Sequence, residues 1–231
     1  SKEEEVEKVL RKWEEILRRL IEENKRANDK IRREYEELVK EIRRVLEEIK
    51  EVAERLGVSE EVKRILEKLI KLLEDILEYE KENVERLIEL NERILRELKK
   101  SVEELKALVT RVRRDGLPES EVRKLVEDVL RKNEELLKEA KKAWRDSIEN
   151  LKRVLEEVAK LVKTVLREIE EKIDDEDVVR ALIEVIERLL RVAEEVIRRI
   201  LKVNTELMRV DERSIRESLK AISEVLKVLD T

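Results

Sequence analysis

The chain has 231 residues, of which 50% are Asp, Glu, Lys or Arg, and its 60 acidic and 55 basic side chains give a net charge of −5. The two signs alternate throughout, which argues against a nucleic-acid surface, and no apolar stretch exceeds three residues, which argues against a membrane span. Since His and Cys are absent, the usual general base, thiol nucleophile and zinc ligands are absent too. We therefore expect a soluble protein that is not an enzyme and requires no cofactor, metal ion or partner.

The first predicted helix covers residues 2–56. It carries an apolar row with a seven-residue period, to which Leu10, Leu17 and Leu38 belong. A strict seven-residue repeat predicts left-handed coiled-coil packing against neighbouring helices. Gly57 is suited to the left-handed conformation that ends a helix, and the helix therefore stops there.

The second and third predicted helices cover residues 59–115 and 118–173. Ser59 can cap the second helix with its hydroxyl group. Gly116 ends this helix, and Pro118 lies in the first turn of the next, where its missing N–H is not needed. The connection between them is therefore short.

The fourth predicted helix covers residues 175–230. It begins at an acidic cluster, residues 174–177, which contains no Gly but suits an N-cap and a first helical turn. Four helices of about 55 residues with short connections predict an all-α, antiparallel up-down-up-down four-helix bundle. We expect a single domain over residues 1–231.

Polar residues interrupt the apolar rows at particular positions, although Asn and Ser are poor residues for a helix interior. They are Asn24, Asn28, Glu80, Asn83, Asn91, Ser101, Asn133, Ser147, Asn150, Asn204, Asp211, Ser214 and Ser218. A buried amide without a partner costs roughly a few kcal/mol. We therefore expect these side chains to hydrogen-bond to one another and to select one register of the helices.

Counting residues from each turn groups twelve of these side chains into three levels. The first level, close to Trp144, contains Asn24, Asn28, Asn91 and Asn204. The second contains Ser101, Asn133, Ser214 and Ser218. The third contains Glu80, Asn83, Ser147 and Asn150, with Tyr35 and Tyr79 nearby to donate phenolic hydrogens.

A ligand pocket or a cation site is the alternative interpretation of the polar residues. Glu80 and Asp211 are the carboxylates that could bind a hard cation, but each is isolated in its own helix among neutral amides. Di-iron bundles need Glu-x-x-His pairs, which a chain without His lacks. The sequence therefore favours structural pairing, with Trp13 and Trp144 as core anchors.

The chain resembles computationally designed helical bundles with buried hydrogen-bond networks. The features that carry this resemblance are outer faces saturated with Glu, Lys and Arg, the opening Ser1-Lys2-Glu3-Glu4, the loops Gly57-Val58-Ser59 and Asp115-Gly116-Leu117-Pro118, and amide layers such as Asn24, Asn91 and Asn204. The resemblance covers the whole chain. It implies a rigid scaffold, a building block for oligomers or heterodimers, or a cage for a switchable helix, and does not choose among them.

Two segments, 62–79 and 178–203, contain more apolar residues than a four-helix bundle requires. The surplus positions are Ile65, Leu72, Tyr79, Val178, Val185 and Val192. They either widen the core or form a surface for a partner. The sequence thus leaves two functions open, a self-contained structural scaffold and an interaction module that self-associates or binds a designed protein partner.

Overall fold

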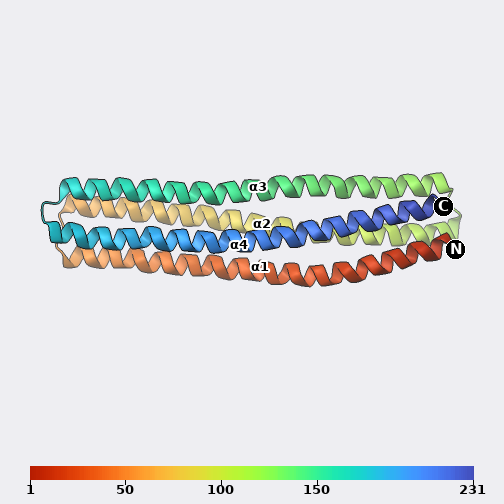
Figure 1. Ribbon diagram of the computed structural model, residues 1–231, viewed down its shortest axis with the longest axis horizontal. Coiled ribbons are helices and arrows are strands. Elements are labelled where there is room, and N and C mark those ends of the chain that lie inside the picture. The colour runs from red at the N-terminus through yellow and green to blue at the C-terminus, as the bar shows by residue number, and fades with distance from the viewer. The chain divides into compact units, whose positions relative to one another are not determined.

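The computed structural model describes residues 1–231, of which 94% are helical and none lies in a strand. The helices are α1 (Lys2–Arg55), α2 (Glu60–Asp115), α3 (Glu119–Lys172) and α4 (Glu176–Leu229) (Figure 1). Each of their ends lies within one residue of its predicted position. The prediction of an all-helical fold made of four long helices that pack against one another is confirmed. None of the four contains a stretch long and apolar enough to cross a bilayer.

The chain forms two compact units, and every helix contributes one segment to each of them. Unit 1 consists of residues 1–29, 86–145 and 205–231, and unit 2 consists of residues 30–85 and 146–204. Both chain ends lie in unit 1 (Figure 1). The heptad rows continue through the residues where the units divide, so the sequence carries no signal of the division, and one domain over the whole chain stays a prediction.

Helices α2 and α4 begin at side chains that accept hydrogen bonds from the first backbone N–H groups. The Ser59 hydroxyl accepts from the N–H of Val62 at 3.3 Å, and the Asp175 carboxylate accepts from the N–H of Asp177 at 3.0 Å. Acidic residues fill the first turn of all four helices, where they interact favourably with the positive end of the helix dipole. Local sequence therefore fixes where α2 and α4 start.

Two glycines end helices in a conformation that other residues avoid. Gly57 and Gly116 have φ values of 61° and 63°, and no other residue has a positive φ. A Cβ atom at either position would meet nothing within 4 Å. A substitution therefore acts through the backbone conformation alone.

The Gly116→Ala variant is expected to lower the free energy of unfolding by about 1 kcal/mol, because alanine adopts the left-handed conformation with difficulty. Urea denaturation followed by circular dichroism measures this change. The matched variant Gly116→Asn should lose less, since asparagine tolerates the same conformation. Equal stability of the alanine variant and the native chain would contradict this account of the loop.

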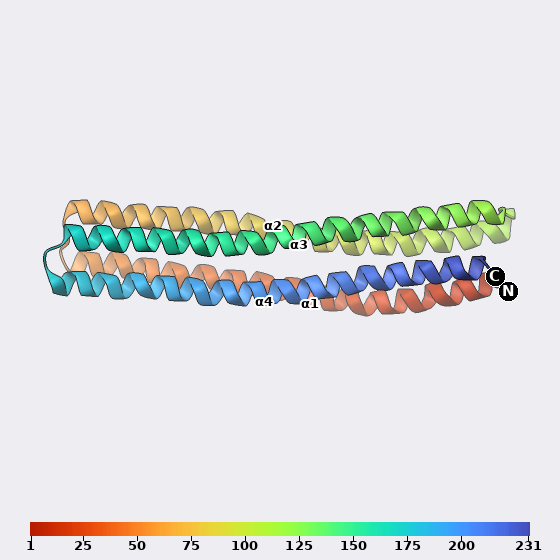
Figure 2. The same ribbon diagram turned by 45° about the horizontal axis from the view of Figure 1, so that its top comes forward.

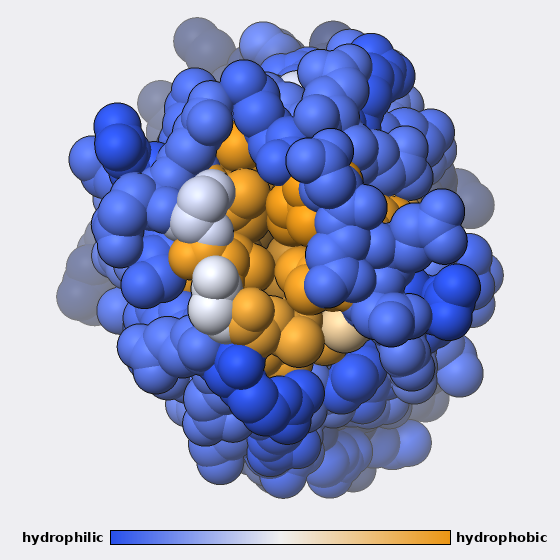
Figure 3. Space-filling view, turned by 90° about the vertical axis from the view of Figure 1, so that its left-hand side faces the viewer, coloured by the Kyte–Doolittle hydropathy of each residue, from blue (hydrophilic) through white to orange (hydrophobic).

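The apolar rows face the interior of each unit. Leu10 and Leu17 are buried in unit 1, and Ile31 and Leu38, from the same row, are buried in unit 2. Figure 3 looks onto the end of unit 2 where α2 and α4 begin, and shows apolar side chains at the centre inside a ring of hydrophilic ones. The alternation of apolar and charged residues therefore separates core from surface, as the sequence predicts.

Ion pairs identify neighbouring helices within each unit. In unit 2, Arg199 on α4 pairs with Glu41 on α1 at 3.2 Å, and Lys172 on α3 pairs with Glu61 on α2 at 2.8 Å. Two views agree that, in this unit, α1 lies beside α4 and α2 lies beside α3 (Figures 1 and 2). The Lys172–Glu61 pair is exposed, and pairs of that kind contribute at most about 1 kcal/mol each. Such a pair therefore shows which helices are in contact more than it stabilises the contact.

Candidate functional site

A chain of hydrogen bonds in unit 1 joins four buried polar side chains from three helices. Asn24 on α1 donates through Nδ2 to Oδ1 of Asp211 on α4. Asn28 donates to the Asn24 Oδ1 atom at 3.1 Å, and Asn91 on α2 donates to the Asn28 Oδ1 atom at 3.2 Å. Asn24, Asn91 and Asp211 are 0% exposed. The structure therefore brings together three of the four residues predicted for the first level.

The fourth predicted member, Asn204, does not join this chain, and Asp211 takes its place. Asn204 is buried in unit 2, and its Oδ1 atom has no hydrogen-bond partner. It occurs seven residues before Asp211 in the same heptad row of α4. The prediction chose Asn204 of these two polar positions, whereas the structure joins Asp211 to Asn24.

The Asp211 carboxyl group lies in an environment that disfavours its charge. Burial raises the pKa of this group well above its ordinary value, and the hydrogen bond from Asn24 opposes the shift. Its second oxygen, Oδ2, has no partner, nor do the Asn91 Oδ1 atom and the Trp144 indole N–H, which are also buried in unit 1. Trp144 was predicted near this level and is a buried core residue. Several hydrogen-bond donors and acceptors of this group therefore lack a partner.

Three of the four residues of the second predicted level take part in two separate hydrogen-bonded pairs in unit 1. Asn133 on α3 donates to the Ser101 hydroxyl on α2 at 2.9 Å. The Trp13 indole N–H on α1 donates to the Ser218 hydroxyl on α4 at 2.8 Å, while Ser214 donates to the backbone of its own helix. The four predicted residues are buried, but no side-chain hydrogen bond joins the two pairs. The sequence analysis did not predict that Trp13 is a hydrogen-bond donor.

In unit 2 the buried carboxyl group of Glu80 forms the centre of the third predicted group. Asn150 on α3 donates to Oε2 of Glu80 at 3.2 Å. Burial raises the pKa of Glu80 to about 7, against the opposing effect of the Asn83 and Asn150 amides. The Asn83 Nδ2 atom makes no hydrogen bond of ordinary geometry, and Ser147 is half-buried and takes no part. Glu80 and Asn150 therefore form the pair that links α2 to α3.

The two tyrosines behave differently from the prediction. Tyr35 is buried, and its hydroxyl donates to the backbone carbonyl oxygen of Leu77 rather than to an amide or carboxylate of the group. Burial, followed by the charge of Glu80, raises the pKa of Tyr35 to about 12. Tyr79 is 51% exposed and donates to none of these residues. The predicted phenolic donation to the polar group is therefore wrong for both.

The six surplus apolar positions fall into three classes. Leu72 and Tyr79 on α2 are exposed, at 36% and 51%. Ile65, Val178 and Val192 are half-buried, and Val185 belongs to the core. Val185 therefore lies in the core, whereas the face of α2 that carries Leu72 and Tyr79 is open to solvent.

The buried polar groups connect helices, and their two carboxyl groups lie in different units. Glu80 lies in unit 2 and Asp211 in unit 1, and each carboxyl group accepts a hydrogen bond from a neutral amide. The structure gathers no three acidic side chains in positions that could hold a metal ion. Comparison of the chain with protein-family models, with curated protein sequences and with solved structures gave no match.

Proposed function

We propose that this protein is a designed structural scaffold without catalytic activity, in which buried polar groups select one arrangement of four long helices. In this proposal the helices run up-down-up-down as an antiparallel bundle with left-handed coiled-coil packing. The function of the scaffold is to maintain one fixed arrangement of its helices. The amide-rich rows and the charge-saturated outer faces support a designed origin.

Ion pairs near the helix ends support the antiparallel arrangement. In unit 1, Glu3 at the start of α1 pairs with Arg113 near the end of α2 at 3.1 Å, and Lys2 pairs with Glu119 at the start of α3 at 2.7 Å. In unit 2, Lys172 at the end of α3 pairs with Glu61 at the start of α2. The seven-residue repeat of the buried rows supports the left-handed packing.

The observation that carries the proposal is the hydrogen-bonded chain Asp211–Asn24–Asn28–Asn91. These groups contribute little net stability, because apolar side chains of similar volume would fill the same space at no desolvation cost. Their benefit is specificity. A helix that slides by one heptad keeps its apolar contacts but separates these donors from their acceptors.

Replacement of all four residues by leucine tests this role. We expect the variant to remain helical and to be at least as stable as the native chain, but to lose its single arrangement. Broadened amide resonances and oligomers in light scattering would report that loss. A control variant in which four buried valines are replaced by leucine should keep sharp resonances. A monomeric quadruple variant with one sharp set of resonances would contradict the proposal.

The exposed face of α2 favours a second candidate, an interaction module that self-associates or docks a protein partner. Leu72 and Tyr79 lie seven residues apart on one helix face, as knobs of a coiled-coil seam do. Light scattering over a dilution series separates the two functions. A mass that stays at 27.7 kDa at every concentration would exclude self-association, and a mass that rises with concentration and falls back in Leu72→Glu would support it.

A further inference from the structure

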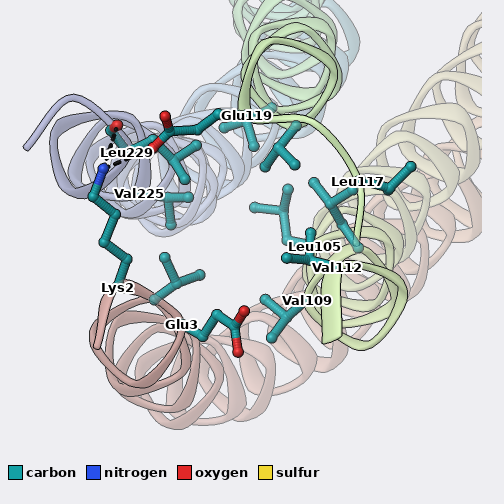
Figure 4. Close-up of a pocket in the computed structure, with 13 residues that line it drawn as sticks. Lys2, Glu3, Leu105, Val109, Val112, Leu117, Glu119, Val225 and Leu229 are labelled. Carbon is teal, nitrogen blue, oxygen red and sulfur yellow. Dashed lines mark hydrogen bonds and ion pairs between the residues drawn. The ribbon is translucent and has the colours of Figure 1, made fainter. Parts of the chain in front are cut away.

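A cavity of 210 Å³ lies in unit 1, at the end where α1 and α3 begin and α2 and α4 finish. Apolar side chains from all four helices line it, among them Val6, Leu105, Val109, Val122 and Val225. Figure 4 shows Leu105, Val109 and Val225 around the open centre, together with Leu117 from the connection between α2 and α3. The last layer of this unit is therefore hollow.

The hollow follows from the residue types that form this layer. Six of its apolar lining residues are valines, namely Val6, Val109, Val112, Val122, Val126 and Val225. Valine fills less volume than leucine or isoleucine, so a layer built mainly from valines leaves space between the helices. Packed interiors leave few voids larger than a water molecule. This cavity is an exception, and it has room for another molecule.

The mouth of the cavity is closed in part by ion pairs rather than by apolar side chains. The Lys2 ammonium group donates to Glu119 Oε1 at 2.7 Å and to the backbone oxygen of Leu229 at 3.3 Å, and so reaches from α1 to α3 and α4 (Figure 4). Glu3, beside it, is held by Arg113 at 3.1 Å. These polar groups satisfy one another, and none of the buried side-chain atoms that lack a partner belongs to the lining.

These features define the chemistry of the occupant. Water is held poorly at the apolar wall, because a buried water needs two to four polar partners and the polar lining residues, Lys2, Glu3 and Glu119, lie at the mouth. Apolar cavities of about 150 Å³ are large enough to hold benzene. An anionic molecule would have to give up its hydration, and the cationic groups near the mouth, Lys2 and Arg113, are already paired with Glu119 and Glu3. We propose that this cavity binds a small neutral hydrocarbon, a monocyclic aromatic ring with one or two methyl groups.

Toluene is the probe for the test, added to the full-length chain. We expect saturable binding of one molecule per chain with a Kd on the order of 1 mM or lower. Methyl resonances of Val109, Val122 and Val225 should shift, and those of Val185 in unit 2 should not. Benzoate, which has the same ring with a carboxylate, should bind at least about tenfold more weakly.

Two variants that fill the cavity to different degrees test whether toluene binds inside it. Val122→Ile with Val225→Ile should weaken toluene binding by at least about tenfold, and Val225→Phe should abolish it. The matched change Val185→Ile should leave the affinity unchanged. The absence of saturation up to the solubility of toluene, methyl shifts spread over both units, or unchanged affinity in the doubly substituted chain would each overturn the proposal.

Discussion

Glu80→Gln is expected to raise the free energy of unfolding by about 3 kcal/mol near pH 8 and to leave it almost unchanged near pH 4. The native chain buries a carboxyl group whose pKa rises from 4.5 to about 7. A shift of this size corresponds to about 3 kcal/mol at about 1.4 kcal/mol per pKa unit. Glutamine has the same shape and carries no charge at any pH.

The direction of the pH dependence follows from the raised pKa. Between pH 4.5 and about 7 the folded chain binds more protons at Glu80 than the unfolded chain does. The stability contributed by the neutral carboxyl group is therefore fully present below the unfolded pKa and is lost as the pH rises through the folded pKa. Asp211, whose pKa burial also raises, contributes with the same sign.

Urea denaturation of the native chain and the variant at a series of pH values measures this difference. Glu74→Gln is the matched control, since Glu74 is exposed on the same helix, and it should follow the native chain throughout. Parallel stability curves for Glu80→Gln and the native chain would mean that Glu80 is not buried in the folded protein.

Asn24→Ala is expected to lower the free energy of unfolding by about 3 kcal/mol, because it leaves two buried groups without partners at about 1–3 kcal/mol each. Those groups are the Asp211 Oδ1 atom and the Asn28 Nδ2 atom, both of which bond to Asn24. Thermal and urea unfolding give the value. Lys25→Ala, one residue further along and exposed, should change the stability by no more than about 0.5 kcal/mol.

A second substitution shows whether the loss arises from the orphaned carboxyl group. Asp211→Ala in the Asn24→Ala background should recover part of the stability, with a coupling energy of roughly 0.5–3 kcal/mol between the two sites. Strict additivity of the two substitutions would show that Asn24 and Asp211 do not interact.

The sequence predicted the helices well because their ends depend on local chemistry. Gly57 and Gly116 can adopt the left-handed conformation that ends a helix, and Ser59 is a good N-cap, so each boundary can be read from two or three neighbouring residues. The buried heptad rows were predictable for the same reason, since periodicity is a property of each helix by itself.

The partners across helices were harder to predict, because they depend on axial offset and rotation. Counting from the helix ends places Asn24 at a height between Asn204 and Asp211, nearly midway, so counting alone does not distinguish the two. Tyr79 was misplaced because its apolar row on α2, which also contains Leu72, lies outside the buried stripe of that helix. Trp13 and Ser218 lie at equal distances from the start of α1 and the end of α4, and a buried indole N–H needs an acceptor, so that pair carried a usable signal.

The contact between Lys2 and the Leu229 carbonyl oxygen brings the first turn of α1 next to the last turn of α4. A short linker could therefore close the polypeptide into a ring without disturbing either helix. The ring could then be reopened at Gly57, where an added Cβ atom would meet no neighbour. Such a circular permutant would keep every buried hydrogen bond of the native chain while moving its free ends from unit 1 to unit 2.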